Sequence, residues 1–220
     1  MNDLVDKIGG ESAPLAAIGN IARRAIASNS EIVPILTDRM ELFLLEEFLD
    51  ESECSSLISL INIRSVPSTV YGHNNGFRTS RSTTFDPGTP IISNIDSRIT
   101  DLLCIPLTYG EDLQGQHYRR GERFGSHFDY FNTRKKYWKI ERINGQRTWT
   151  VMVYLNDAVG GETEFPSIRR FIEPRRGLLV AWNNLDEAGI PNRHSLHGSA
   201  PVRSGDKYII TKWFRGQPLQ

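Results

Sequence analysis

Residues 114–130 read QGQHYRRGERFGSHFDY and open the half of the chain that decides the fold. This stretch begins with a β-type run, and similar runs follow at 148–155 (TWTVMVYL), 177–182 (GLLVAW) and 207–214 (KYIITKWF). Glycine, proline and asparagine lie between them, and short strands separated by such turn residues are typical of a sandwich or jelly roll. The sequence therefore predicts a mainly β fold of α+β class.

Two helices are predicted ahead of these strands, where they can support a sheet. Asp50 can cap a helix that runs through about Ile63. Ser93 can cap a second helix that runs on to Leu103.

Residues 12–28 place apolar side chains at helical spacing and predict an amphipathic helix before the main domain. That helix either packs against the body of the protein or offers a surface to a partner. We divide the chain into an N-terminal helical extension, residues 1–33, and one domain, residues 34–220.

The composition is that of one ordinary globular domain. The 220 residues contain 26 Lys and Arg against 26 Asp and Glu, so the formal net charge is zero. A neutral chain argues against a nucleic-acid partner, because sequence-independent binders present a strongly basic face to phosphates.

Two further features of the sequence bear on the cellular compartment in which the protein is expected. Cys54 and Cys104 match neither a zinc site nor a redox pair, and we interpret both as packing residues in a reducing environment. We find no signal-peptide pattern and no apolar stretch long enough to cross a membrane. The sequence therefore predicts a cytoplasmic protein without a membrane partner.

The pair His127 and Asp129 is the first candidate for chemistry. Side chains two residues apart on a strand project from the same face, so the imidazole and the carboxylate can converge on one cation. A second imidazole from a distant strand would complete the two-histidine, one-carboxylate triad that holds iron(II) and leaves positions for substrate and oxygen. His194 and His197 compete for that place.

The residues after His197 predict a turn into another strand, with the reversal at Gly205 and Asp206. His197 would end one strand and Lys207 would start the next. The ammonium group of Lys207 would then lie near the metal, at a distance that a short dicarboxylate could bridge.

Three segments in order (116–131, 147–166 and 195–213) resemble the prolyl 4-hydroxylase family of iron(II)- and 2-oxoglutarate-dependent dioxygenases. The resemblance runs from about Glu41 to Arg215. It implies a double-stranded β-helix, or jelly roll, with helices on one side.

The resemblance also implies roles for individual residues. His127, Asp129 and His197 become the iron ligands, which places His194 outside the metal site. Lys207 pairs with the distal carboxylate of 2-oxoglutarate, and Tyr118 donates a hydrogen bond to the same carboxylate.

Several further positions have two interpretations. Thr163 resembles a residue of the cosubstrate pocket, or it is a structural β-former. Arg147 resembles an arginine that faces the peptide substrate, or it is a surface residue, and Trp213 either lines the site or belongs to the core. Tyr130 is expected to line a substrate groove, whereas Phe124 stands where several family members carry a tyrosine that faces the peptide.

Two segments complete the comparison with the family. The stretch Phe77–Ser80 resembles the start of its mobile flap. The charged segment within 131–146 has no clear counterpart, and we interpret it either as a contact for an acidic partner or as a solvated loop.

The activity implied is hydroxylation of a prolyl residue, with C4 as the expected position, in a peptide or protein. The reaction uses iron(II), 2-oxoglutarate and O2 and releases succinate and carbon dioxide; a need for ascorbate and the oligomeric state are left open. Two alternatives remain at this point. The same chemistry could act on a free amino acid, another side chain or a small molecule, or the jelly roll could be a binding module that senses iron or 2-oxoglutarate without turnover.

Overall fold

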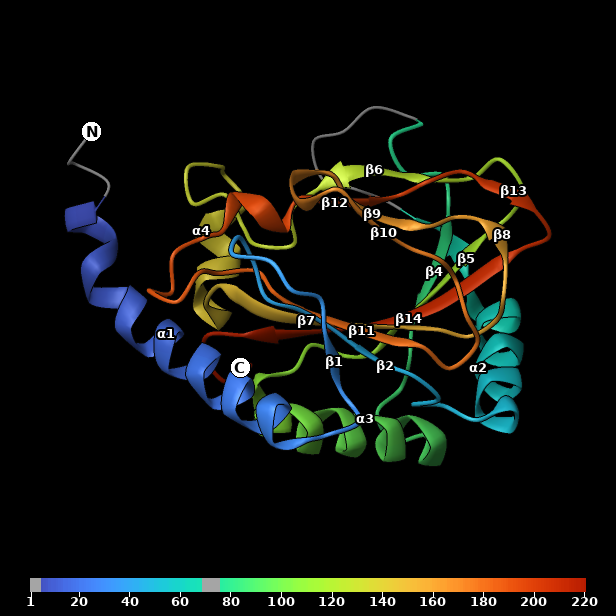
Figure 1. Cartoon of the computed structure of the whole chain (residues 1–220), viewed down its shortest axis with the longest axis horizontal. Helices are drawn as coiled ribbons and strands as arrows, with labels where there is room; N and C mark the ends of the chain where they lie inside the picture. Colours follow the sequence, from blue (N-terminus) through green and yellow to red (C-terminus); the bar gives the residue numbers. More distant parts are fainter. Residues whose placement is uncertain (1–4, 69–75) are drawn as a thin grey trace.

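An eight-stranded antiparallel sheet forms one layer of the molecule (Figure 1). The computed structural model describes residues 5–68 and 76–220 and orders these strands β1-β2-β11-β7-β14-β5-β4-β3. They are β1 Val33–Pro34, β2 Leu42–Leu45, β3 Val66–Pro67, β4 Arg81–Thr84, β5 Gln114–Tyr118, β7 Arg147–Tyr154, β11 Leu179–Asn183 and β14 Lys207–Arg215.

A smaller four-stranded sheet lies over the main sheet, above it in Figure 1. Its order is β10-β9-β12-β6, and a two-stranded ladder pairs β13 with β8. The bounds are β6 Phe124–His127, β8 Val159–Gly160, β9 Thr163–Phe165, β10 Arg170–Ile172, β12 His197–Ser199 and β13 Val202–Ser204. Two sheets face to face without closure into a barrel give the predicted jelly roll.

Strand β7 shows how the two faces of the main sheet are divided. Val151 and Val153 are buried in the core that includes the helices, whereas Met152 and Tyr154 are buried in a second core between the sheets. Alternate side chains of a strand point to opposite faces, so this buried strand contributes to both cores.

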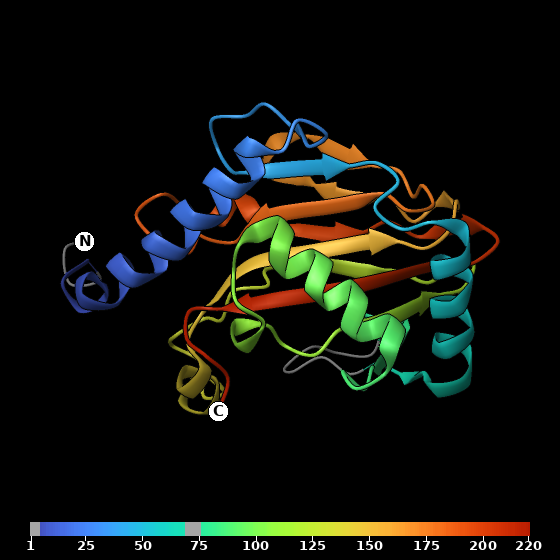
Figure 2. The ribbon, with the colours of Figure 1, turned by 90° about the horizontal axis from the view of Figure 1, so that it is seen from below.

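Three helices cover the outer face of the main sheet (Figure 2). They are α1 Val5–Ser28, α2 Glu51–Arg64 and α3 Pro90–Leu103, and α3 buries Ile92, Ile95, Ile99 and Leu103 at helical spacing. The shorter helices are η1 Leu107–Tyr109, α4 Trp138–Glu141, η2 Arg142–Asn144, η3 Pro166–Ile168 and η4 Arg193–Ser195.

The predicted caps have different outcomes. The Asp50 carboxylate accepts from the Glu53 amide at 2.8 Å, and the Glu53 carboxylate accepts from the Asp50 amide at 3.0 Å. This capping box confirms the predicted start of α2. The predicted start of α3 at Ser93 is wrong, because the helix begins at Pro90, whose fixed φ suits a first helical position.

Helix α1 packs onto the body through Ala22 and Ile26, both buried in the core beneath the sheet. Arg23 forms an ion pair with Glu41, and Asn183 donates to the same carboxylate at 2.7 Å. The helix is therefore tied to the strands that follow it, while the boundary between residues 1–33 and 34–220 stays a prediction.

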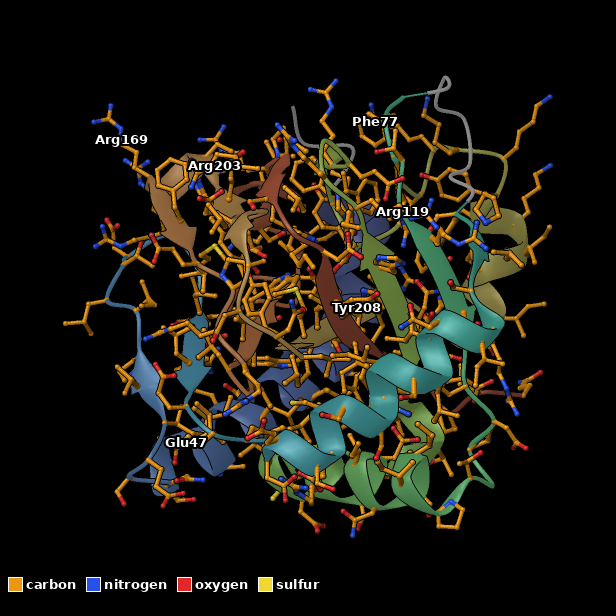
Figure 3. All side chains as sticks on the ribbon, turned by 90° about the vertical axis from the view of Figure 1, so that its right-hand side faces the viewer. Glu47, Phe77, Arg119, Arg169, Arg203 and Tyr208 are labelled. Carbon is orange, nitrogen blue, oxygen red and sulfur yellow. The ribbon has the colours of Figure 1, made fainter. Side chains whose placement is uncertain are left out.

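Helix α2 lies across one end of the main sheet (Figure 3). Tyr208 of β14 donates a hydrogen bond of 2.9 Å to Asn62 of this helix.

The two cysteines differ in burial. Cys54 is buried in α2 as predicted. Cys104 is exposed at the end of α3 with a φ of 51°, so its interpretation as a packing residue is wrong. Among the described residues no helix is long and apolar enough to span a bilayer.

Candidate active site

Two imidazole rings face each other on neighbouring strands of the smaller sheet. His197 of β12 pairs with His127 of β6, and their ring centroids are 4.4 Å apart. Each Nδ1 lies 2.9 Å from a backbone carbonyl oxygen, of Gly125 for His127 and of Ser195 for His197. A carbonyl only accepts, so each Nδ1 carries a proton, and Nε2 is the ring nitrogen left to bind a metal.

Asp129 completes the group from just beyond the end of β6. Its Oδ1 lies 3.6 Å from Nε2 of His127, and its Oδ2 lies 3.6 Å from Nε2 of His197. The expectation that His127 and Asp129 share a strand is wrong, because β6 ends at His127 and the chain bends there. Phe128 has 38% of its surface exposed and lines the same pocket as the pair, so the expectation that it points the opposite way is wrong.

The three ligand atoms lie within 4.8 Å of one another. Within residues 5–68 and 76–220 no other group of three His, Cys, Asp or Glu side chains meets that geometry. Two imidazoles and one carboxylate whose ligand atoms can meet one metal ion from the same side match the facial triad of iron(II) oxygenases.

A chain of hydrogen bonds fixes the carboxylate. Thr150 of β7 donates to Oδ2 of Asp129 at 2.7 Å, and Asn184 donates to the Thr150 hydroxyl at 2.8 Å. Trp182 in turn donates to the Asn184 oxygen at 3.1 Å. Sequence reasoning missed these hydrogen bonds. The sequence does offer one signal for them: Thr150 is a polar residue between the apolar Trp149 and Val151 of a predicted strand.

The protonation states of the cluster suit a metal. Burial would raise the pKa of Asp129, but His197 and His127 beside it hold that pKa well below its usual range. Burial lowers the pKa of His197 to about 4, against the opposing effect of Asp129. At neutral pH the cluster thus offers a carboxylate and an unprotonated His197, as metal ligation requires.

His194 lies apart from the cluster, in η4, where its amide donates to Asn192 at 2.9 Å. Of the two candidate histidines, the structure brings His197 to the pair. His197 begins β12, so the prediction that it ends a strand is wrong, whereas Lys207 begins β14 as predicted and Gly205 makes the reversal with a φ of 69°.

Lys207 and Tyr118 form one end of the pocket, which we call the inner end. The pairing of β14 with β5 places them opposite each other, and Nζ of Lys207 lies 4.2 Å from the Tyr118 ring centroid. Nζ donates to the Gly161 carbonyl at 2.8 Å and to the Ser199 hydroxyl. The Tyr118 hydroxyl donates to Gln116 at 2.8 Å, so a bond from it to 2-oxoglutarate requires this one to be exchanged.

Lys207 is a buried cation without a close carboxylate. Only 1% of its surface is exposed, and no described carboxylate oxygen lies within 4 Å of Nζ. Burial lowers the pKa of Lys207 to about 7, against the weaker effect of Glu162. An anion entering this end would supply the missing counter-charge.

Thr163 also lies at the inner end, on β9. Its Oγ1 is 2.5 Å from the Tyr154 hydroxyl, which itself donates to the Ile172 carbonyl at 3.0 Å. Sequence reasoning missed Tyr154 and Ser199. Ser199 follows His197 by two residues on the same strand, which is a signal that it shares the face of the ligand.

Arg147 belongs to the opposite end, which we call the outer end. Its Nε and Nη2 bind the two oxygens of Glu111 at 2.7 and 2.6 Å. Nε of Arg215 binds the same Glu111 carboxylate at 2.5 Å, and its Nη2 binds Glu141 of α4 at 2.6 Å. Two arginines and two carboxylates thus form one continuous chain of ion pairs, and sequence reasoning found only Arg147 among them.

Aromatic rings surround this network. The Arg147 guanidinium lies 4.2 Å from the Trp213 ring centroid and 5.0 Å from that of Phe131. Tyr130 stacks on Phe128 at 4.7 Å, while Phe124 stacks on His127 at 3.7 Å. Trp213 is partly buried, and its Nε1 has no hydrogen-bond partner within the described part of the chain.

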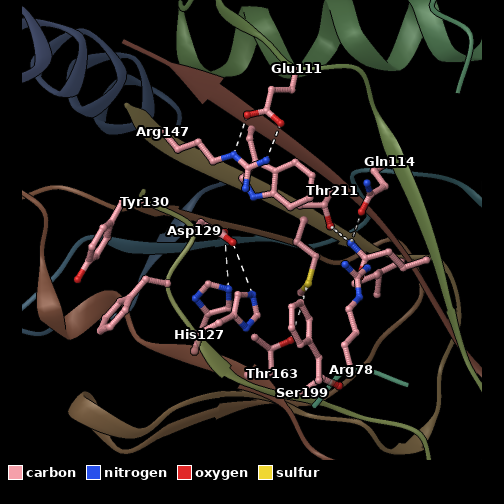
Figure 4. A pocket seen from close by; sticks show the side chains of 18 of the residues that line it. Arg78, Glu111, Gln114, His127, Asp129, Tyr130, Arg147, Thr163, Ser199 and Thr211 are labelled. Carbon is pink, nitrogen blue, oxygen red and sulfur yellow. Dashed lines mark hydrogen bonds and ion pairs between the residues drawn. The ribbon is translucent and has the colours of Figure 1, made fainter. Parts of the chain in front are cut away.

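One pocket of about 550 Å³ joins the metal cluster to both ends. Figure 4 shows Glu111 and Arg147 on one side of Asp129, and Thr163, Ser199 and Arg78 on the other. All nine predicted site residues line this pocket: Tyr118, His127, Asp129, Tyr130, Arg147, Thr163, His197, Lys207 and Trp213.

Comparisons with known proteins agree with this geometry. Residues 113–215 match the model of the 2OG-Fe(II) oxygenase superfamily. The chain is 33% identical to prolyl 4-hydroxylase 2 of Arabidopsis thaliana over 214 residues, which cover 84% of this chain and 70% of the relative.

Two solved structures share the fold. A viral collagen prolyl hydroxylase from Paramecium Bursaria Chlorella virus-1, solved with 2-oxoglutarate, superposes with a TM-score of 0.64 at 26% identity, over 81% of this chain and 96% of that one. A prolyl hydroxylase from Trichoplax adhaerens gives a TM-score of 0.63 at 15% identity, over 92% and 90% of the two chains. The chain therefore belongs to the prolyl 4-hydroxylase family of 2-oxoglutarate- and iron(II)-dependent oxygenases.

Proposed function

We propose that this protein hydroxylates a prolyl residue, at C4, within a peptide or protein. In the overall reaction one atom of O2 enters the prolyl C–H bond and the other enters succinate, while 2-oxoglutarate loses carbon dioxide. Iron(II) with 2-oxoglutarate supplies the activation of oxygen, and the protein supplies binding, orientation and electrostatics.

The metal cluster fits iron(II). Nε2 of His127, Nε2 of His197 and one oxygen of Asp129 would be the ligands. Their orientation is set before a metal arrives, because carbonyl groups bind both Nδ1 atoms and Thr150 binds the carboxylate. Ligands on one side alone leave room for a chelating cosubstrate and for oxygen.

The inner end fits 2-oxoglutarate, and this observation carries the proposal. A buried ammonium with no close carboxylate from residues 5–68 or 76–220 shares one pocket with a facial triad, which is the arrangement a keto acid with a distal carboxylate requires. Lys207 would neutralise the distal carboxylate, with hydrogen bonds from Ser199 or Thr163 beside it.

The outer end fits a prolyl residue. Its cations are already paired, so its surface is aromatic and electrically neutral, which suits an apolar ring held in a polyproline-like chain. Nε1 of Trp213 is a buried donor without a partner among the described residues, and a peptide carbonyl would accept from it. The relative in Arabidopsis and the viral relative are both named as prolyl hydroxylases, which supports the same substrate class here.

Two observations weigh against the alternatives. The pocket adjoins a second groove through Tyr130 and Phe131, which a free amino acid would not fill. The intact triad, with its own supporting hydrogen bonds, argues against a binding module without turnover. A cytoplasmic location and the absence of a nucleic-acid partner stay predictions.

The test is turnover of proline-containing peptides with iron(II), 2-oxoglutarate and O2, read as succinate formed and as a peptide mass gain of one oxygen. Asp129→Ala should abolish both signals because it removes a ligand. An anaerobic titration that follows the visible band of the iron and 2-oxoglutarate chelate tests the site without any peptide. Succinate formation that no proline peptide stimulates would contradict the prolyl substrate, and a missing band in the folded protein would contradict the oxygenase site.

A further inference from the structure

A second groove of about 940 Å³ adjoins the pocket that holds the metal cluster. Tyr130 and Phe131 line both cavities, so a chain leaving the pocket passes directly into the groove. One wall is the segment 131–146, which contains α4; Figure 1 shows α4 beside the loop 183–194, and Figure 2 shows it beside the C-terminus. The other wall combines α1, that loop and the chain end.

The lining of the groove is apolar at its base. Leu15 of α1, Trp138 of the segment 131–146, and Ile190 and Pro191 of the loop 183–194 all contribute to it. Ile143 lines the groove and is half exposed. Apolar side chains from three separate parts of the chain thus form one surface suited to an extended polypeptide.

The rim of the groove is basic, because Arg134 and Arg142 line it and belong to a segment rich in cations. Between residues 134 and 142 the chain carries five cations and one carboxylate, in a protein whose net charge is zero. The carboxylate, Glu141, is bound by Arg215. The cations are exposed and, within the described residues, none of them forms an ion pair: Arg134, Lys135, Lys136, Lys139 and Arg142.

This basic segment is held firmly at its base. Arg215 binds Glu141 and also donates to the Gly145 carbonyl at 3.0 Å. The Gln146 side chain binds the backbone of Phe131 on both sides, accepting from its amide at 2.6 Å and donating to its carbonyl at 2.9 Å. The cations therefore project from a preorganised wall, which lowers the entropy cost of binding.

We propose that this groove is a subsite for the polypeptide that flanks the target proline, and that it selects flanking segments with acidic residues. The inference rests on the proposed function, because it extends the substrate of the same pocket. Continuity through Tyr130 and Phe131 identifies the occupant as the substrate chain, and the unpaired cations determine its charge.

The test uses a synthetic proline- and alanine-containing peptide whose flanking residues are all Glu, all Gln or all Lys. For the wild-type holoenzyme we expect KM to rise from the Glu peptide through Gln to Lys, and the Glu preference to weaken as salt is added. In Arg134→Glu/Arg142→Glu the ratio of kcat/KM for the Glu peptide over the Gln peptide should fall about tenfold.

Two matched variants isolate the groove. Arg134→Lys/Arg142→Lys keeps the charge and should keep the ratio. Arg64→Glu/Arg170→Glu reverses two exposed cations that do not line the groove, and it should also keep the ratio. An equal fall in this last variant, or no charge preference in the wild type, would overturn the proposal.

Binding of the same peptides, followed by fluorescence anisotropy with the anaerobic holoprotein, separates this inference from the proposed activity. Charge-dependent binding that Arg134→Glu/Arg142→Glu removes, without hydroxylation, would support the groove and contradict the prolyl hydroxylase. Hydroxylation with no charge preference would support the prolyl hydroxylase and contradict the groove as a subsite for acidic segments. Binding of an RNA oligonucleotide but of none of the peptides would overturn the subsite and assign the basic rim to nucleic acid.

Discussion

The inner and outer ends of the pocket both contain buried cations, but their charges are balanced differently. At the inner end Lys207 has hydroxyl and carbonyl partners and, in the part of the chain that the structure describes, no close carboxylate. At the outer end Arg147 and Arg215 share Glu111, and Arg215 also binds Glu141. The inner end therefore lacks a counter-charge until an anion binds, whereas the cations of the outer end are neutralised by protein carboxylates before any ligand binds.

This difference shows what each end recognises. A buried charge without a partner is costly, and a ligand that neutralises it gains the interaction without competition from a protein carboxylate. Cations that are already neutralised by protein carboxylates offer a ligand no such gain in binding free energy. The ion-pair network at the outer end therefore serves to hold the surrounding aromatic side chains in place. The inner end thus selects a charged cosubstrate, and the outer end shapes a site for a neutral ring.

The largest effect is expected when the inner cation is removed. Lys207→Met should weaken 2-oxoglutarate binding by about 100- to 1000-fold, because the distal carboxylate would be buried without a counter-charge. The same variant should raise the melting temperature of the ligand-free protein at slightly acid pH, since it removes an uncompensated buried ammonium. Anaerobic titration and thermal unfolding measure the two effects, and a ligand-free variant that melts below wild type would contradict the uncompensated charge.

Breaking the outer network should have the opposite thermal effect. Glu111→Gln leaves two arginines without their shared carboxylate and should lower the free energy of unfolding by about 2 to 3 kcal/mol. We expect KM for a proline peptide to rise while the affinity for 2-oxoglutarate stays within about twofold of wild type. Denaturant unfolding and separate titrations check this, and equal losses for both ligands would mean that the two ends are not independent.

The metal cluster lies between the two ends and depends on a hydroxyl group. Thr150→Val removes the donor to Asp129 and should weaken iron(II) binding by about 10- to 100-fold. Thr150→Ser keeps the hydroxyl and serves as the matched control. Metal titration measures both variants, and a Thr150→Val protein with wild-type iron affinity would show that packing alone orients the carboxylate.

The metal cluster and the inner end were accessible to prediction because their residues carry local signals. His127 and Asp129 lie two positions apart, and Lys207 follows a turn at Gly205, so spacing and the family resemblance together point to them. The strand β14 was found for a similar reason, since its run of β-branched and aromatic residues begins just after the turn at Gly205.

The outer end was largely hidden because its partners are far apart in the sequence. Glu111, Arg147 and Arg215 meet through the pairing of β7 with β14, and no local pattern joins a carboxylate to an arginine a hundred residues later. The Thr150 to Asn184 bond was hidden in the same way. The start of α3 was missed for another reason: proline at its first position places the start upstream of the predicted cap.

The smallest effect expected is a dependence of 2-oxoglutarate affinity on pH. Because burial lowers the pKa of Lys207 to about 7, the free protein loses this charge as the pH rises through that value, and binding then requires uptake of a proton. The dissociation constant should be flat below about pH 7 and should rise by up to about tenfold per unit above it. With a pKa of about 4, His197 stays unprotonated throughout, so it does not contribute to the change. Anaerobic titrations at saturating iron(II) test this, with Lys207→Met as the control whose weak binding should lack the rise, and a wild-type constant independent of pH would mean that Lys207 keeps its proton without the ligand.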